Sequence, residues 1–135
     1  MVKVSVIIPV YNVAPYLGEC LDSVLQQSLK DIEIVCVDDC STDNSSFLLK
    51  KYAESDIRIR LFYNERNRDL SFTRNRGLKE SCGEYVFFLD SDDALYDNEV
   101  LKELYIIAEQ DDLNWFPDES EKEYVVNTAV YPAGY

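Results

Sequence analysis

The stretch EYVFFLDSDD, residues 84–93, constrains the fold of this chain more than any other. Its apolar residues, 85–89, are large on both alternating faces, which is typical of a strand covered on both sides in a parallel sheet. The strand then ends in three acids, Asp90, Asp92 and Asp93. Because ligands gather at the carboxyl ends of strands in open parallel sheets, we expect a binding site here.

Asp90 and Asp92 should point the same way if the extended conformation continues past Leu89, since alternate residues of a strand share a face. Two converging carboxylates need a counter-charge, and a hard divalent cation such as Mg²⁺ or Mn²⁺ prefers oxygen ligands. The sequence therefore predicts a divalent-cation site. A solvated acidic turn is the alternative interpretation.

The charge of the chain is unevenly distributed. A net charge of -13 over 135 residues and a pI near 4.2 argue against a surface that binds nucleic acid or anionic membranes. Residues 58–79 nevertheless carry seven of the 13 basic residues and two acids, so this window has a charge of about +5 while the rest has about -18. Such a patch indicates an anionic ligand bound at one place, with surface salt bridges as the alternative.

The cysteines and the first residues of the chain indicate in which cellular compartment the protein is expected. The four cysteines form no pair of CxxC motifs and the chain has no histidine, which argues against a structural zinc site. Cys20 and Cys36 lie in apolar patterns and are expected to be buried free thiols of a cytosolic protein. Residues 2–10 do not resemble a signal peptide. We therefore expect a cytoplasmic protein that reaches the inner face of the membrane through partners.

Hydrophobic periodicity predicts alternating strands and helices. The expected strands are residues 4–8, ended by Pro9, then 32–37, 57–63 near an edge, and 85–89. Four helices are expected. The first has Pro15 in its first turn, and the second is capped within residues 41–43. The third spans residues 71–81 and is closed by Gly83, and the fourth has an apolar stripe over residues 100–108. This order predicts an α/β fold of three layers, α/β/α, with a mostly parallel sheet.

The domain organisation follows from length and from this pattern. At 135 residues the chain is expected to form one domain. Its motifs fall within residues 3–110, and residues 111–135 form a tail in which strands are expected at 113–116 and 124–130.

Three predicted strand ends carry polar clusters, at residues 9–12, 38–39 and 90–93, and they fall on one edge of the sheet. Tyr11 offers a flat face for a ring, and an ionised Asp39 can accept an N–H from a planar heterocycle. Packing on the first helix is the alternative for Tyr11. For Asp38 we expect a turn or capping role.

Four ordered motifs in residues 3–110 resemble those of the family 2 glycosyltransferases of GT-A fold. They run from Val4 to Asn12, from Val37 to Asp43, from Thr73 to Gly77 and from Gly83 to Asp93. The resemblance implies a Rossmann-like nucleotide-diphospho-sugar transferase fold. It also implies a nucleotide-binding set with one metal ligand, Asp92, and these other members: Pro9, Tyr11, Asp39, Arg74, Asp90 and Ser91.

The resemblance assigns a role to most of these residues. Tyr11 would stack near the base, Asp39 would accept a hydrogen bond from it, and Arg74 would lie near the diphosphate. Asp90 and Asp92 would hold the ribose and a divalent cation, Mn²⁺ or Mg²⁺. A metal and an arginine together would neutralise the leaving nucleoside diphosphate.

The implied function is transfer of a sugar, with inversion, from a nucleotide sugar to a glycan or a lipid-linked acceptor in cell-surface polysaccharide or glycan synthesis. A UDP-linked donor is expected because a uracil-sized ring with one imide N–H suits one acceptor, Asp39, beside Tyr11.

The sequence departs from the family pattern at two places. Cys40 stands where the family usually has glycine. No residue after Asp97 matches the acceptor-binding motifs or the general base, so we expect a donor-binding half, truncated or degenerate, that binds the donor without efficient transfer. Self-association is expected through four poorly covered aromatic residues, Trp115, Phe116, Tyr131 and Tyr135.

Two other functions stay open. Phosphoryl-transfer domains also hold magnesium at acidic strand ends, but they place an aspartate after the first strand, where this chain has Pro9 and Tyr11. A nucleotide-binding or assembly module without turnover fits the missing acceptor half.

Overall fold

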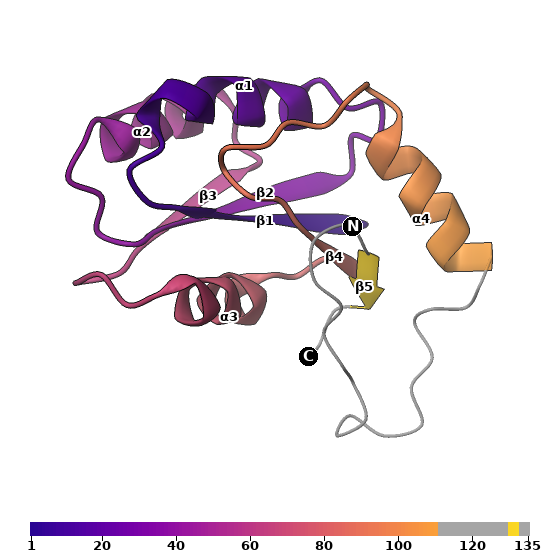
Figure 1. Cartoon of the computed structure of the whole chain (residues 1–135). Coiled ribbons are helices and arrows are strands. Elements are labelled where there is room, and N and C mark those ends of the chain that lie inside the picture. The colour runs from indigo at the N-terminus through magenta and orange to yellow at the C-terminus, as the bar shows by residue number, and fades with distance from the viewer. Residues whose placement is uncertain (111–129, 133–135) are drawn as a thin grey trace.

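The computed structural model describes residues 1–110 and 130–132 (Figure 1). Five strands form one sheet in the order β3-β2-β1-β4-β5. The strands are β1 (Val4–Val10), β2 (Ile32–Asp38), β3 (Ile59–Tyr63), β4 (Tyr85–Phe88) and β5 (Val130–Pro132). The helices are α1 (Ala14–Leu25), α2 (Ser45–Ser55), α3 (Leu70–Glu80) and α4 (Val100–Gln110). β1 to β4 are parallel and β5 runs antiparallel to β4, so the mostly parallel sheet is confirmed.

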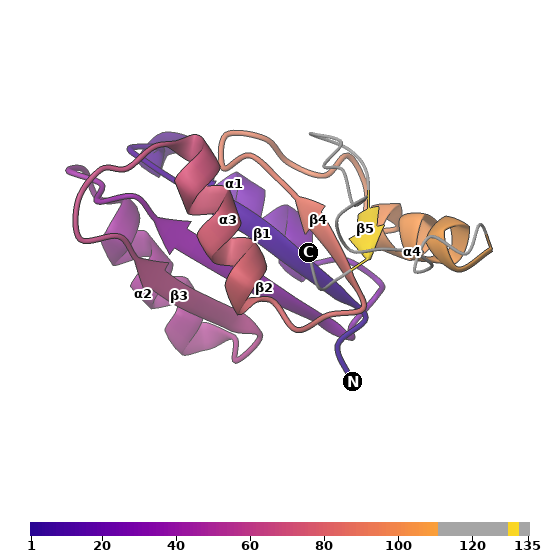
Figure 2. The same ribbon diagram turned by 90° about the horizontal axis from the view of Figure 1, so that it is seen from below.

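Helices cover both faces of the sheet. Figures 1 and 2 show α1 and α2 over one face and α3 over the other. Even-numbered residues of β1, from Val4 to Val10, pack with α1, α2 and α4, whereas Ile7 packs with Leu78 of α3. Every residue of β1 and of β2 is buried as a result. This confirms the three-layer α/β/α architecture.

β1 does not end at Pro9, as predicted, but continues to Val10. Leu89 donates its N–H to the carbonyl of Ile7, so the backbone groups of Ile7, and of Pro9 two residues on, face β4. The register between β1 and β4 ends at the pair of Ile7 and Phe88. Pro9, which has no N–H, therefore lies beyond the last residue of β1 that pairs with β4, and no hydrogen bond between these strands is lost.

Other predicted boundaries hold within a few residues. β3 is the edge strand, as predicted, but it begins at Ile59 because Ile57 is 96% exposed. The N-cap of α2 is Asn44 rather than a residue of 41–43. The predicted strand at 113–116 lies outside the described residues, and of the predicted strand at 124–130 only Val130 is described, as the start of β5.

A polar network ties the amino end of the sheet to the connection between α3 and β4. Glu33, only 4% exposed, accepts hydrogen bonds from Ser5 Oγ at 2.5 Å, from Cys82 N at 2.6 Å and from Arg60 Nη1 at 2.8 Å. Burial on its own would raise the pKa of the Glu33 carboxyl, but the hydrogen bonds from Ser5, Cys82 and Arg60 outweigh it and hold the pKa below its ordinary value. The ionised carboxylate is therefore the form that the fold stabilises.

Two glycines allow close approach to β1. A Cβ on Gly83 would lie 2.7 Å from Ser5 Oγ, so Gly83 serves this contact and does not close α3, whose C-cap is Ser81. A Cβ on Gly77 would overlap Ile7 Cγ2. α3 can therefore lie against the sheet only where it presents no side chain.

Replacing Glu33 by Gln should lower the free energy of unfolding at pH 7 by about 1–3 kcal/mol, because charge-assisted hydrogen bonds are lost. The folded-state pKa lies below the unfolded one, so the stabilisation is complete above the ordinary value of 4.5 and is lost as the pH falls through the folded-state value. The difference between Glu33→Gln and the parent should therefore shrink in urea titrations below that pH. Glu54→Gln, at an exposed site, is the control. A difference in unfolding free energy between Glu33→Gln and the parent that does not change with pH would contradict the stabilising role of the ionised Glu33 carboxylate.

Gly77→Ala should destabilise the protein by about 1–3 kcal/mol, because the added methyl group overpacks the contact between α3 and Ile7. Gly18→Ala is the matched control: its Cβ would meet only the Tyr52 hydroxyl, at 3.3 Å, and alanine favours a helix by up to about 1 kcal/mol. Equal stability of Gly77→Ala and Gly18→Ala in thermal unfolding would contradict the overpacking of α3 against Ile7.

Candidate functional site

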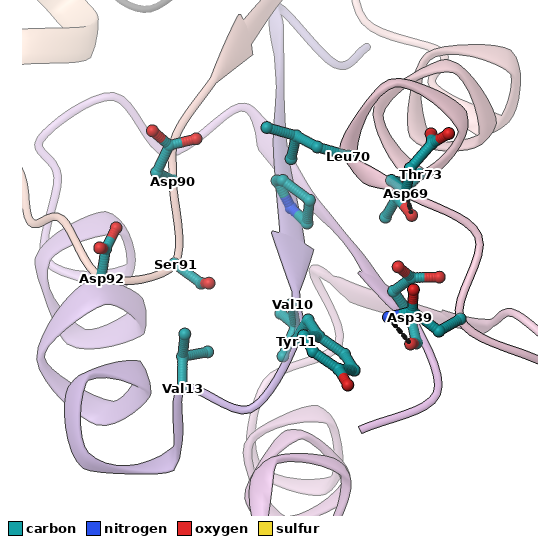
Figure 3. Close-up of a pocket in the computed structure, with 12 residues that line it drawn as sticks. Val10, Tyr11, Val13, Asp39, Asp69, Leu70, Thr73, Asp90, Ser91 and Asp92 are labelled. Atoms are coloured by element: carbon teal, nitrogen blue, oxygen red, sulfur yellow. Dashed lines mark hydrogen bonds between the residues drawn. The ribbon is translucent and has the colours of Figure 1, made fainter. Parts of the chain in front are cut away.

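A cavity of about 490 Å³ opens at the carboxyl edge of the sheet, beyond the ends of β1, β2 and β4 (Figure 3). Asp90 to Asp92 lie on one side of it and Asp39 with the start of α3 on the other, with Tyr11 between them. Six of the seven residues predicted for the site line this cavity: Pro9, Tyr11, Asp39, Asp90, Ser91 and Asp92. The seventh, Arg74, is bonded to Asp90.

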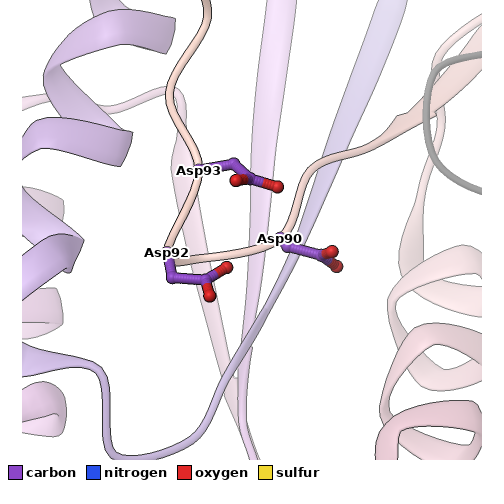
Figure 4. A group of neighbouring side chains, drawn as sticks. All are labelled: Asp90, Asp92 and Asp93. Atoms are coloured by element: carbon purple, nitrogen blue, oxygen red, sulfur yellow. The ribbon is translucent and has the colours of Figure 1, made fainter.

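The acidic turn, residues 90–93, brings three carboxylates together (Figure 4). One carboxylate oxygen from each of Asp90, Asp92 and Asp93 lies within 4.8 Å of the others. β4 ends at Phe88, and Asp93 N bonds to Asp90 O at 3.0 Å, so a turn causes the convergence rather than the strand alternation that we predicted. For this reason Asp93 joins the pair expected from the sequence. Three close carboxylates offer the oxygen donors that a hard divalent cation prefers.

Arg74 reaches the acidic turn from α3. Its Nη2 lies 2.9 Å from Asp90 Oδ1, and the Arg74 side chain is only 19% exposed. The ion pair joins α3 to the end of β4 and places a fixed positive charge beside the carboxylates. A charge at this position can stabilise a further anion bound at the turn.

Polar residues in α1 and just after it hold the segment that follows the acidic turn. Gln27 is fully buried; its Nε2 donates to Asp97 O at 2.6 Å and its Oε1 accepts from Leu101 N at 3.1 Å. Ser23 Oγ accepts from Leu95 N at 3.0 Å. Neither Gln27 nor Ser23 was predicted from the sequence, although polar residues at helical spacing beside an apolar stripe were an available signal.

Cys20, also on α1, lies directly behind the acidic turn. Its thiol donates to Asp90 O at 3.8 Å. Burial, followed by the charges of Asp93, Asp92 and Asp90, raises the pKa of this thiol to about 12. The thiol therefore stays protonated at neutral pH and leaves the carboxylates as the ligand atoms. Cys20 and Cys36 are buried and free, as predicted.

Asp39 is held on the far side of the cavity. It is 4% exposed, and its Oδ1 accepts from Asn64 Nδ2 at 2.9 Å and from Arg68 N at 2.8 Å. Asn64 Nδ2 also lies 3.0 Å from Thr73 Oγ1, which links the carboxylate to α3. These supporting contacts fix one face of Asp39. The two that end on Asp39 could not be predicted from local sequence patterns, because they join residues 25 and 29 positions apart.

The neighbouring turn explains two features of the sequence. Asp38 Oδ1 accepts from Ser41 N at 3.2 Å, which confirms the turn role predicted for Asp38. Cys40 has φ of 62°, in the left-handed region that favours glycine. The glycine expected at this position thus has a conformational reason, and Cys40 occupies the same conformation at some cost.

Asn12 fixes the end of β1 against this turn. It also has a positive φ, of 50°, and its Oδ1 accepts from Thr42 N at 2.8 Å and from Asp43 N at 3.3 Å. The preceding residue, Tyr11, is 45% exposed at the mouth of the cavity. Tyr11 therefore stands on an anchored backbone with its ring open to a ligand.

The loop before α3 and the first turn of this helix supply lining that was not predicted as part of the site, although Thr73 belongs to the third motif: Asn67, Asp69, Leu70 and Thr73. Asp69 is the N-cap of α3, with Oδ1 accepting from Phe72 N at 2.7 Å. An acid just before a predicted helix is a cap signature, so this signal was available.

Comparison with known proteins gives one consistent result. The sequence profile of Glycosyl transferase family 2 matches residues 5–117. Glycosyltransferase GlyA of Streptococcus pneumoniae is 52% identical over 91 residues, which are 67% of this chain and 13% of GlyA.

Two solved structures match the fold closely. Staphylococcus aureus TarS 1-349 in complex with UDP-GlcNAc aligns with a TM-score of 0.74 and 36% identity, over 80% of this chain and 31% of TarS 1-349. The mannosyltransferase PcManGT of Pyrobaculum calidifontis, in complex with GDP-Man and Mn²⁺, aligns with a TM-score of 0.71 and 29% identity, over 76% of this chain and 31% of PcManGT. The chain thus spans less than a third of each of these three proteins.

Proposed function

Because this chain belongs to glycosyl transferase family 2, we propose that it forms the nucleotide-sugar-binding part of a glycosyltransferase. The observation that carries the proposal is the cavity at the carboxyl edge of the sheet. It combines a flat ring, a buried acceptor and a cluster of carboxylates, and these are the groups that a base, a base N–H and a metal-bound diphosphate require.

The base would bind between Tyr11 and Asp39. Tyr11 offers its ring for stacking, while Pro9 and Ser91 line the same cavity. The two hydrogen bonds to Asp39 described above both end on Oδ1, so Oδ2 is the oxygen that we assign to a ring N–H. We propose a UDP-linked donor, which is supported by the UDP-GlcNAc bound to TarS.

The diphosphate would bind at the acidic turn with a divalent cation, Mn²⁺ or Mg²⁺. Asp92 is the ligand that we assign, with Asp90 and Asp93 beside it. PcManGT, whose structure holds Mn²⁺ with GDP-Man, supports this assignment. The cation would act as a Lewis acid on the diphosphate oxygens. Arg74, held on Asp90, would add a second positive charge for the leaving group.

The reaction that we propose is direct displacement at the anomeric carbon, with inversion, by a hydroxyl of a glycan or lipid-linked acceptor. The chain's own residues would hold the donor and stabilise the charge of the departing nucleoside diphosphate. In the part of the chain described here, no helix is long and apolar enough to span a membrane. We place the reaction at the cytoplasmic face of the membrane, in cell-surface polysaccharide synthesis.

Binding of UDP should depend on a divalent cation. We expect titration calorimetry to give at least about tenfold tighter UDP binding with Mn²⁺ than with chelator, because the metal bridges like charges. Asp92→Asn should remove most of this gain without unfolding the sheet. Asp31→Asn, an exposed site at the opposite edge, should keep it. Equal affinity for UDP in Mn²⁺ and in chelator would rule out the metal assignment.

The base preference should depend on Asp39. UDP and dTDP should bind more tightly than CDP by about 1–3 kcal/mol, since cytosine lacks the imide N–H. Asp39→Ala should flatten this preference, while Asp69→Asn, which lines the same cavity, should preserve it. Circular dichroism controls for folding. A parent protein that binds the three nucleotides equally would exclude this role for Asp39.

A further inference from the structure

A second cavity, of about 580 Å³, lies where the edge strand β3 meets the loop that leads to α3. It shares no lining residue with the first cavity. Its lining residues all fall within residues 63–76 and are mostly basic or aromatic: Tyr63, Asn64, Glu65, Arg66, Arg68, Phe72 and Arg76. This basic cavity is separate from the first one and is not used by the function proposed above.

The six arginines of the chain divide into two sets. Three of them, Arg58, Arg60 and Arg74, form ion pairs with carboxylates at 2.8–2.9 Å. The other three all line the second cavity, and none of them forms an ion pair with a carboxylate among the residues that the structure describes. These three arginines lack such a partner among the described residues although the chain has 26 acidic residues and only 13 basic ones. Their charge is thus available to a ligand.

Neighbouring groups hold two of these three arginines in place. The Arg68 guanidinium carbon lies 4.1 Å from the centre of the Phe72 ring. Arg76 Nη1 donates to the Tyr63 carbonyl and to Asn64 Oδ1, the latter at 3.0 Å. Guanidinium groups that are fixed before a ligand arrives lose less side-chain entropy on binding. The cavity is therefore organised around its positive charges.

We propose that the second cavity binds a phosphate monoester group, carried by a soluble phosphorylated molecule or by a lipid headgroup. Three arginines and one acid, Glu65, give its lining a charge of +2. A phosphate monoester carries about -1.5 to -2 at neutral pH and matches this charge, whereas a carboxylate would leave half of it unbalanced. The planar fork of arginine also suits phosphate oxygens.

The second cavity is connected to the first through Asn64. Asn64 accepts from Arg76 through Oδ1 and donates to Asp39 Oδ1 through Nδ2 at 2.9 Å, and Arg68 N donates to the same Asp39 oxygen at 2.8 Å. A phosphate drawn to Arg68 and Arg76 thus acts on the residues that hold Asp39. Phosphate and nucleotide should change each other's affinity by the same factor. This coupling, unlike the phosphate site, rests on the nucleotide binding proposed above.

The test is calorimetric titration of the 135-residue protein with glycerol 3-phosphate at low salt. Arg66→Gln and Arg68→Gln should each weaken binding about tenfold, because each removes a charge-assisted contact. Both side chains are exposed, and the backbone N–H of Arg68 still reaches Asp39, so the fold should survive. Lys79→Gln makes the same charge change on α3 outside the cavity, and Arg74→Gln tests the first cavity; both should bind within about twofold of the parent.

Three results would overturn the site: no binding of glycerol 3-phosphate and no binding of vesicles, equal weakening by Lys79→Gln, or loss in Arg74→Gln with Arg66→Gln and Arg68→Gln unaffected. Vesicles of phosphatidylcholine with and without phosphatidic acid separate the two sources. Cosedimentation with phosphatidic acid that Arg68→Gln abolishes identifies a lipid headgroup, and binding of glycerol 3-phosphate alone identifies a soluble ligand. Binding of phosphate without any binding of UDP would end the proposed function and leave this site standing.

Discussion

Burial of β1 and β2 on both faces is the constraint on which the rest of the structure depends. Neither strand has an exposed residue, so the middle of the sheet has no room for ligand chemistry. Polar side chains that can reach a ligand appear only where these strands end, and the carboxyl ends of parallel strands lie at one edge of the sheet. The first cavity, with Tyr11 after β1 and Asp39 after β2, is a direct result of this geometry.

Two acidic groups of the first cavity, Asp39 and Asp90, are each held by a neutral or positive group behind them. Asn64 and the Arg68 backbone hold Asp39, and Arg74 holds Asp90. Ser23 of α1 and Gln27, just after this helix, hold the segment after the acidic turn. Like charges placed close together destabilise a fold unless such contacts offset their repulsion. The supporting contacts thus allow the carboxylates to remain clustered before any cation arrives.

Sequence reasoning reached the strands, the helices and most of the first cavity because these depend on local patterns: apolar runs, helical stripes and acids at strand ends. It failed where the outcome depends on a distant neighbour. Pro9 fits within β1 only because β4 stops at Phe88, and Asp93 joins its neighbours only because the backbone turns after Leu89. Gln27 and Asn64 bond to residues far along the chain. The basic window was visible in the sequence, but which of its arginines lack an acidic partner among residues 1–110 and 130–132 was not.

The position of Cys20 gives this protein a built-in chemical reporter. Cys40 and Cys82 are exposed, whereas Cys20 is buried between α1 and the acidic turn, and its raised pKa keeps the thiolate scarce. Alkylating reagents react with thiolates, so they should modify the exposed Cys40 quickly and reach Cys20 only when the turn lifts from α1. The rate at which Cys20 is modified, measured separately from that of the buried Cys36, therefore reports how often the carboxylate cluster opens, without any label added to the site itself.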